Sequence, residues 1–135
     1  MIGDYDHPRT RLPGAGGAPE IASSCDEVIV VANHDKRTFV EKLDFVTTVG
    51  NGDGAGSRDR LGFRGRGPTA VITDLGVLEP DPPTKELVLT QLHAGVTVEQ
   101  AREATGWKLR VAAEVRTTAP PTEVELAALR ELMSR

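Results

Sequence analysis

The hydrophobic positions along the chain fall into short runs, and these runs predict several strands. Residues 28–32 are a continuous apolar run rich in valine and isoleucine, typical of a strand buried on both faces of a parallel sheet. Residues 70–74 and 87–92 predict two further strands, which would form a hairpin across the proline-rich stretch 80–83. Residues 107–111 alternate apolar and polar side chains, as expected of a half-exposed strand.

Two helices are predicted from the residues that would cap them. Thr97 and Gln100 have the spacing of a capping box, which predicts a helix over 97–105 ended by Gly106 in a left-handed conformation. The same spacing of a threonine and a glutamate opens an amphipathic helix over 122–133. Together with the strands, these helices predict an α/β chain with few strands.

Glycine and proline mark the segments between these elements. The chain has 14 glycines and nine prolines, and most of them are bunched. Residues 50–67, which also carry four arginines, predict a flexible, solvated loop, and residues 76–83 predict another connection. Residues 1–12 lack apolar periodicity and predict an irregular lead-in, whereas the mixed segment 39–46 suits either a strand or irregular structure.

Composition and charge narrow the class of protein. The 135 residues predict a single domain over 1–135, and 39% hydrophobic with 27% charged residues is ordinary for a globular chain. A net charge of −4 gives no surplus of basic residues for nucleic acid, and no apolar run is long enough to cross a bilayer. Cys25 is the only cysteine, which excludes an intrachain disulfide and a cysteine metal cluster. We therefore expect a cytoplasmic protein that binds neither nucleic acid nor membrane and holds no metal.

The strongest local signal for chemistry is the glycine segment 13–19, ahead of a predicted short helix over 20–25. Glycines allow positive φ and let a ligand approach the backbone closely. The spacing is not the dinucleotide fingerprint, because Pro19 stands where that pattern needs glycine. The loop at 50–67 is not a phosphate-binding P-loop, because no G-K-[ST] follows it. The segment 13–19 is either a ligand-contacting loop or a plain structural turn.

Isolated polar residues leave further alternatives open. His34 and Asp35 suit either an oriented acid–base pair or a structural role, since no serine or cysteine stands in a nucleophile motif. His93 suits a hydrogen-bonded turn, and Cys25 suits packing as a small apolar residue. Four carboxylates suit a nucleophile or, equally well, a cap or an ion pair: Glu20, Glu41, Asp44 and Asp74.

Four segments, in order along almost the whole chain, carry a resemblance to a known family. They are 11–22 (RLPGAGGAPEIA), 34–45 (HDKRTFVEKLDF), 70–77 (AVITDLGV) and 92–107 (LHAGVT…TGW). The second is similar to the motif H-x-K-R-x-F-V-E-K-x-D-F, and the third to V-I-T-D-L-G-V-F, with Leu78 at the phenylalanine. The fourth is similar to L-H-P-G-V-T…T-G-W, with Ala94 at the proline. The chain resembles beta subunits of family I coenzyme A-transferases, of the 3-oxoacid, 3-oxoadipate and glutaconate type.

This resemblance implies a fold, a partner and a reaction. The fold would be α/β with a partial doubly wound sheet of the CoA-transferase type, and the chain would be the C-terminal half of a beta subunit that pairs with an alpha subunit. The reaction would move CoA from an acyl-CoA, as substrate and without a cofactor, through an enzyme glutamyl-CoA thioester. The family's nucleophilic glutamate lies in an S-E-N-G-like motif upstream of the glycine loop. This sequence has no such motif, so no catalytic residue is assigned in it.

The resemblance also assigns one site and leaves two other functions open. Gly16 and Gly17 match the glycine pair whose second amide helps to form the oxyanion hole for the thioester carbonyl. The Arg-rich loop at 51–66 is an insertion relative to the family pattern and receives no role. The alternatives are a CoA-thioester hydrolase subunit of the same family and a non-catalytic scaffold that pairs with an alpha subunit.

Overall fold

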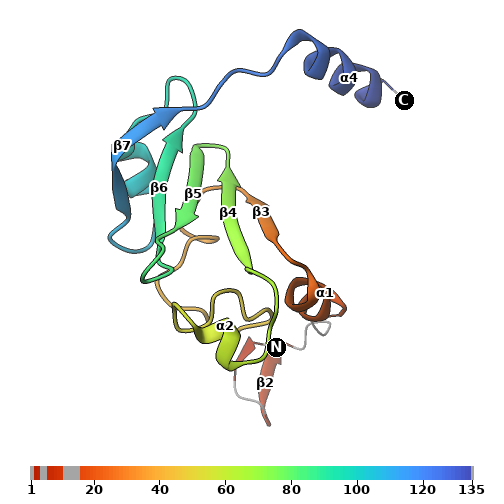
Figure 1. Ribbon diagram of the computed structural model, residues 1–135, viewed down its shortest axis with the longest axis vertical. Helices are drawn as coiled ribbons and strands as arrows, with labels where there is room; N and C mark the ends of the chain where they lie inside the picture. Colours follow the sequence, from red (N-terminus) through yellow and green to blue (C-terminus); the bar gives the residue numbers. More distant parts are fainter. Residues whose placement is uncertain (1, 4–5, 11–15, 135) are drawn as a thin grey trace.

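The fold is an α/β arrangement around one mixed five-stranded sheet (Figure 1). The computed structural model describes residues 2–3, 6–10 and 16–134. The elements in chain order are β1 (Ile2–Gly3), β2 (Pro8–Thr10), α1 (Ala18–Ser24), β3 (Val28–Ala32), α2 (Ser57–Arg60), β4 (Pro68–Thr73), β5 (Gly76–Pro80), β6 (Leu87–Leu92), α3 (Val98–Glu103), β7 (Arg110–Thr117) and α4 (Glu123–Met133). The sheet order is β3-β4-β5-β6-β7, in which the two outer pairs are parallel and the two inner pairs antiparallel.

The core lies on the inner strands of this sheet. Leu78 in β5 and Leu89 in β6 are register partners, and both are fully buried. The other buried apolar residues are Phe39, Val71, Leu92, Ala101 and Leu109. Ala101 brings α3 onto this cluster, and the predicted capping box of Thr97 and Gln100 is present at the start of that helix. The predicted α/β class is therefore confirmed.

Strand β5 is absent from the sequence prediction and changes the predicted hairpin. Residues 76–83 predicted a connection because glycine and prolines are rare inside strands. Gly76 instead lets two strands approach closely, because a Cβ there would collide with the carbonyl oxygen of Gln91. The hairpin therefore joins β5 to β6, whereas β4 pairs with β5 and does not touch β6 in the ladder.

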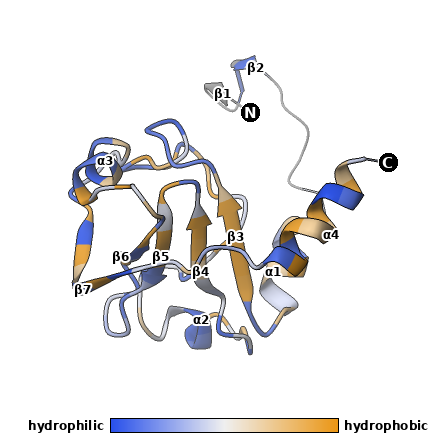
Figure 2. Cartoon of the chain, turned by 90° about the horizontal axis from the view of Figure 1, so that it is seen from above, coloured by the Kyte–Doolittle hydropathy of each residue, from blue (hydrophilic) through white to orange (hydrophobic). Residues whose placement is uncertain are grey.

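Strand β3 lies at the edge of the sheet, so the prediction that it is buried on both faces is wrong for this chain. It pairs in parallel with β4, and no other strand among the described residues pairs with it. Ile29 is 56% exposed and Val31 is 78% exposed, and Figure 2 shows this hydrophobic strand at the side of the sheet. An apolar strand with an unpaired edge is a surface to which another strand or chain can add.

Two other predicted boundaries differ from the structure, and one alternative left open by the sequence is decided. Gly106 does not adopt a left-handed conformation; its N–H donates to the Phe39 carbonyl, and a Cβ there would lie 2.6 Å from that oxygen. The strand predicted at 107–111 is β7, which begins at Arg110. Segment 39–46, for which a strand and irregular structure were both open, is irregular.

The two ends of the described chain lie outside this core. The predicted irregular lead-in is wrong in part, because β1 and β2 form a two-stranded antiparallel sheet. Helix α4 has the predicted capping box, of Thr122 and Glu125, and it extends away from the sheet (Figure 1). It buries none of its residues, and Val124 and Met133 are each 80% exposed. Among residues 2–3, 6–10 and 16–134, each helix is too short or too polar to span a lipid bilayer.

Candidate functional site

The predicted site at Gly16 and Gly17 is the turn that leads into α1. Gly16 has φ +63°, a left-handed conformation that glycine adopts readily and β-branched residues do not. Gly17 is the N-cap of α1 with φ −80°, and its carbonyl accepts the Ile21 N–H at 3.0 Å. Pro19 lies in the first turn of the helix, as its missing N–H favours. The rest of the glycine segment, residues 13–15, lies outside the described residues.

The space beside this turn is open. Both glycines are exposed, and a Cβ built on Gly16 would meet no atom of the described residues within 4 Å. A Cβ on Gly17 would meet only the Ile21 side chain, at 3.9 Å. The backbone is therefore reachable by a ligand, and the left-handed Gly16 sets the orientation of the peptide that carries the Gly17 N–H.

Helix α1 also borders the Arg-rich loop. A cavity of about 190 Å³ lies between them, lined by Ala22 and Ser23 of α1 and by Arg58, among others. The carbonyl of Cys25 lies so close to Gly65 that any side chain on that glycine would collide with it. The C-terminal part of α1 therefore packs against the loop.

The loop over 50–67 is less exposed to solvent than its composition predicts. It contains α2, and its Ser57 and Arg58 are buried. The Arg58 Nε donates to the Gly65 carbonyl at 2.9 Å, and its Nη1 donates to the Gly50 carbonyl at 2.7 Å. The guanidinium also lies over the Phe63 ring, 5.1 Å from its centroid. One arginine thus ties the two ends of the loop together, which no local sequence pattern signals.

His34 serves the core and not an acid–base pair. Its side chain is 5% exposed and stacks on Phe39, with ring centroids 4.1 Å apart. The Thr73 Oγ1 accepts two backbone N–H groups of the following turn, donates to the Gly76 carbonyl at 3.0 Å, and lies 3.2 Å from the His34 Nδ1. The Thr105 Oγ1 donates to a carbonyl and accepts from the His34 Nε2 at 2.9 Å. The contact with Thr105 therefore places a proton on the His34 Nε2.

The buried neutral state of His34 predicts that stability falls in mild acid. Burial lowers the pKa of His34 below its ordinary value of 6.5, against an opposing rise from the charges of Asp74 and Asp35. Below pH 6.5 His34 binds a proton in the unfolded chain but stays neutral in the folded chain. The stability that is present above pH 6.5 is therefore lost as the pH falls toward the pKa of His34 in the folded chain. Urea unfolding at about pH 7.5 and about pH 5.5 checks this. A His34→Gln variant should show a smaller pH slope, and an equal slope in both proteins would contradict the assignment.

The remaining candidate residues have structural positions. Asp35 accepts the backbone N–H groups of Thr38 and Arg37, and these hydrogen bonds lower its pKa. His93 contacts the Thr118 hydroxyl through Nδ1, at 2.8 Å, in the turn role predicted for it. Cys25 is exposed at the end of α1, which corrects its predicted packing role.

The four candidate carboxylates do not gather into a site. The Asp74 carboxylate accepts the His34 N–H at 2.7 Å and so holds the start of the 34–45 segment against β4. Glu20, Glu41 and Asp44 are exposed on separate segments. Within the described ranges, no group of three or more histidine, cysteine, aspartate or glutamate side chains is arranged to hold a metal ion.

Comparison with known proteins defines the class to which this fold and glycine turn belong. Residues 1–104 match the protein family described as Coenzyme A transferase. The chain belongs to this family, as its four sequence segments implied.

Individual relatives are consistent with this assignment. The chain is 55% identical, over all 135 residues, to a 3-oxoadipate CoA-transferase subunit of Pseudomonas knackmussii, and covers 52% of that protein. It is 43% identical over 124 residues (91% of the chain, 46% of the relative) to a glutaconate CoA-transferase subunit of Acidaminococcus fermentans. The crystal structure of glutaconate coenzyme A-transferase from Acidaminococcus fermentans matches with a TM-score of 0.81 and 39% identity, covering 96% of this chain and 50% of that one. The chain thus spans about half the length of the relatives it matches.

Proposed function

We propose that this chain is part of a coenzyme A-transferase beta subunit, which moves CoA between an acyl-CoA and a carboxylic acid such as a 3-oxoacid or a dicarboxylate. Its 55% identity along the whole chain to a 3-oxoadipate CoA-transferase subunit carries the proposal. The reaction passes through an enzyme glutamyl-CoA thioester whose glutamate is not among these 135 residues. The CoA thioester is a substrate, no cofactor takes part, and the enzyme acts in the cytoplasm.

The part of the chain assigned to the reaction is the glycine turn. When a carboxylate attacks a thioester carbonyl, negative charge develops on the carbonyl oxygen, and an aimed N–H stabilises it by about 3 kcal/mol. The Gly17 N–H takes this role in the proposal, because it follows the left-handed Gly16 at an exposed turn with open space beside it. In this proposal the chain positions the Gly17 N–H as a hydrogen-bond donor, and the segment that carries the glutamate supplies the nucleophile.

We also propose that the chain assembles with an alpha subunit. Two apolar surfaces without a partner among the described residues support this. Strand β3 exposes Ile29 and Val31 at the sheet edge, and α4 exposes Leu129 and Leu132 on one side of an amphipathic helix. Exposed apolar surfaces of this kind mark sites of association.

A CoA-thioester hydrolase is the less favoured alternative. The cholesterol ring-cleaving hydrolase subunit of Mycobacterium tuberculosis is 30% identical over 132 residues, which are 98% of this chain and 52% of that protein. Both transferase subunits are more similar to this chain, at 55% and 43% identity. The comparison therefore favours transfer over hydrolysis.

A chimera tests the proposed function. These 135 residues replace the matching segment of the Pseudomonas knackmussii 3-oxoadipate CoA-transferase subunit, and the product is produced with its alpha subunit. We expect CoA exchange between succinyl-CoA and 3-oxoadipate, because the relative supplies the glutamate and this chain supplies the glycine turn. The control is the same chimera with its glutamate nucleophile changed to alanine, which should assemble without exchange. An assembled, folded chimera that hydrolyses acyl-CoA or does nothing contradicts the proposal.

A further inference from the structure

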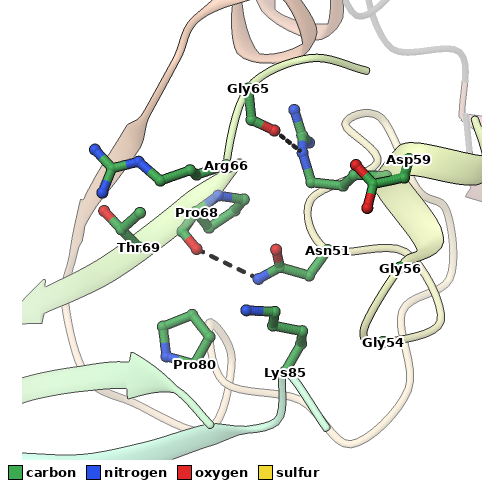
Figure 3. A pocket seen from close by; sticks show the side chains of 11 residues that line it. Asn51, Gly54, Gly56, Asp59, Gly65, Arg66, Pro68, Thr69, Pro80 and Lys85 are labelled. Atoms are coloured by element: carbon green, nitrogen blue, oxygen red, sulfur yellow. Dashed lines mark hydrogen bonds between the residues drawn. The ribbon is translucent and has the colours of Figure 1, made fainter. Parts of the chain in front are cut away.

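A second cavity, of about 320 Å³, lies where the Arg-rich loop meets the sheet (Figure 3). This volume lies within the range of small-molecule pockets, which is about 300–1,000 Å³. Its walls come from three segments: the loop with α2, the start of β4, and the β5–β6 turn. Gly54, with φ +119°, brings the loop against that turn, because a Cβ there would lie 3.0 Å from the Thr84 carbonyl oxygen.

The lining of this cavity is cationic in a chain whose net charge is −4. Three basic side chains line it, namely Arg58, Arg66 and Lys85, against one carboxylate, that of Asp59. Asn51 and Thr69 add an amide and a hydroxyl to the same wall. Positive side chains converging on a hollow concentrate a positive potential there and favour an anion.

The ammonium group of Lys85 extends into this cavity and is not paired with its acidic neighbours. Figure 3 shows its side chain extending from the β5–β6 turn toward Asn51. Its two acidic neighbours, Asp81 and Glu86, are both engaged by Arg110, at 2.8 and 3.5 Å. The Lys85 ammonium makes no hydrogen bond or ion pair with the described residues, although the residue is partly buried. A half-buried ammonium without a partner is stabilised when an anion binds beside it.

The two arginines of the cavity, Arg58 and Arg66, differ in the groups that they already contact. Arg66 forms an exposed ion pair with Glu27 at 2.9 Å, which Thr69 also contacts, so its guanidinium is held at the rim by a competing carboxylate. Arg58 is 8% exposed, and its Nη2 is buried without a hydrogen-bond partner in the part of the chain that the structure describes, whereas Nε and Nη1 bind carbonyls. Since no carboxylate of the described residues forms an ion pair with it, this buried guanidinium adds its charge to the cavity wall.

We propose that this cavity is a binding site for a phosphoryl oxyanion. A tetrahedral phosphate offers acceptors in several directions, which suits the Lys85 ammonium of the β5–β6 turn together with the Arg58 guanidinium and the Asn51 amide of the loop. Lysine binds phosphate as a point charge and needs no planar match. The group arrives either as inorganic phosphate or as a phosphate of the nucleotide end of coenzyme A. Binding is measurable without turnover, so the proposal does not depend on the proposed function.

The test is a titration of the whole 135-residue chain with inorganic phosphate and, separately, with adenosine 3′,5′-bisphosphate at low ionic strength. Amide chemical shifts of Asn51, Thr69 and Lys85 report the site. The variant is Lys85→Asn, because Lys85 has φ +63° and asparagine tolerates that conformation while removing the charge. Lys108→Asn is the matched control, since Lys108 is exposed and lies outside the cavity lining.

We expect saturable shifts at these amides and a loss of affinity of about tenfold in Lys85→Asn, with Lys108→Asn unchanged. Tighter binding of the bisphosphate than of phosphate supports the site and identifies the nucleotide as its ligand. Equal affinity supports the site for a free phosphoryl group. The proposal is overturned if neither anion shifts the cavity amides, or if Lys85→Asn and Lys108→Asn weaken binding equally, which is the result of screening by surface charge.

Discussion

Replacing Gly16 with valine is expected to slow formation of the enzyme thioester by about a hundredfold to a thousandfold, in a complete beta subunit together with its alpha partner. Gly16 has φ +63°, which a β-branched residue adopts only with strain. We expect the turn to relax by rotating the peptide between residues 16 and 17. In the proposed mechanism this rotation moves the Gly17 N–H away from the carbonyl oxygen of the thioester. Single-turnover formation of the thioester from acyl-CoA measures the loss.

Two control variants test whether the loss of rate comes from the left-handed backbone conformation of Gly16. Gly16→Asn keeps a residue that visits the left-handed region, so it should retain more of the rate than valine. Gly17→Ala should be close to the unmodified rate, because Gly17 has φ −80° and its Cβ would lie 3.9 Å from the nearest atom. A folded, assembled Gly16→Val subunit with an unchanged rate would remove the glycine turn from the mechanism.

Leu78→Ala is expected to lower the free energy of unfolding by about 2–5 kcal/mol. Leu78 is fully buried in β5, at the centre of the sheet, opposite the equally buried Leu89. Truncation removes apolar contacts and leaves a cavity that two paired strands cannot close. Because whole domains are stable by only about 5–15 kcal/mol, the loss is a large share of the total.

Urea unfolding followed by circular dichroism measures this effect. Leu129→Ala in α4 is the control, since Leu129 is 52% exposed and its truncation should change stability by less than about 0.5 kcal/mol. Equal destabilisation by the two substitutions would mean that α4 packs as tightly as the centre of the sheet, which contradicts the architecture described above.

The candidate site was only partly predictable from local pattern. Glycine at 16 and 17 signals a special backbone, and the family resemblance supplied the oxyanion role, which stays a prediction. Arg58 gave no such signal, because an arginine among glycines is typical of a solvated loop. Its burial depends on the carbonyls of Gly50 and Gly65, two residues that meet only when the loop closes.

Local chemistry by itself determined the elements whose signals are complete within a few residues. The capping boxes at Thr97 and Thr122 start α3 and α4 as predicted, since cap and partner are three residues apart. The apolar runs at 70–74 and 87–92 likewise became β4 and β6. Family membership also followed from ordered segments of sequence.

Only the tertiary structure decided the features that depend on distant backbone. Gly76 belongs to a strand because it lies against Gln91, and Gly106 is a close contact with Phe39 and not a helix cap. An apolar run such as 28–32 has the same pattern at an edge as at the centre of a sheet, so its exposure depends on which strands flank it. The cationic cavity likewise exists because three segments meet, and no single stretch of sequence contains it.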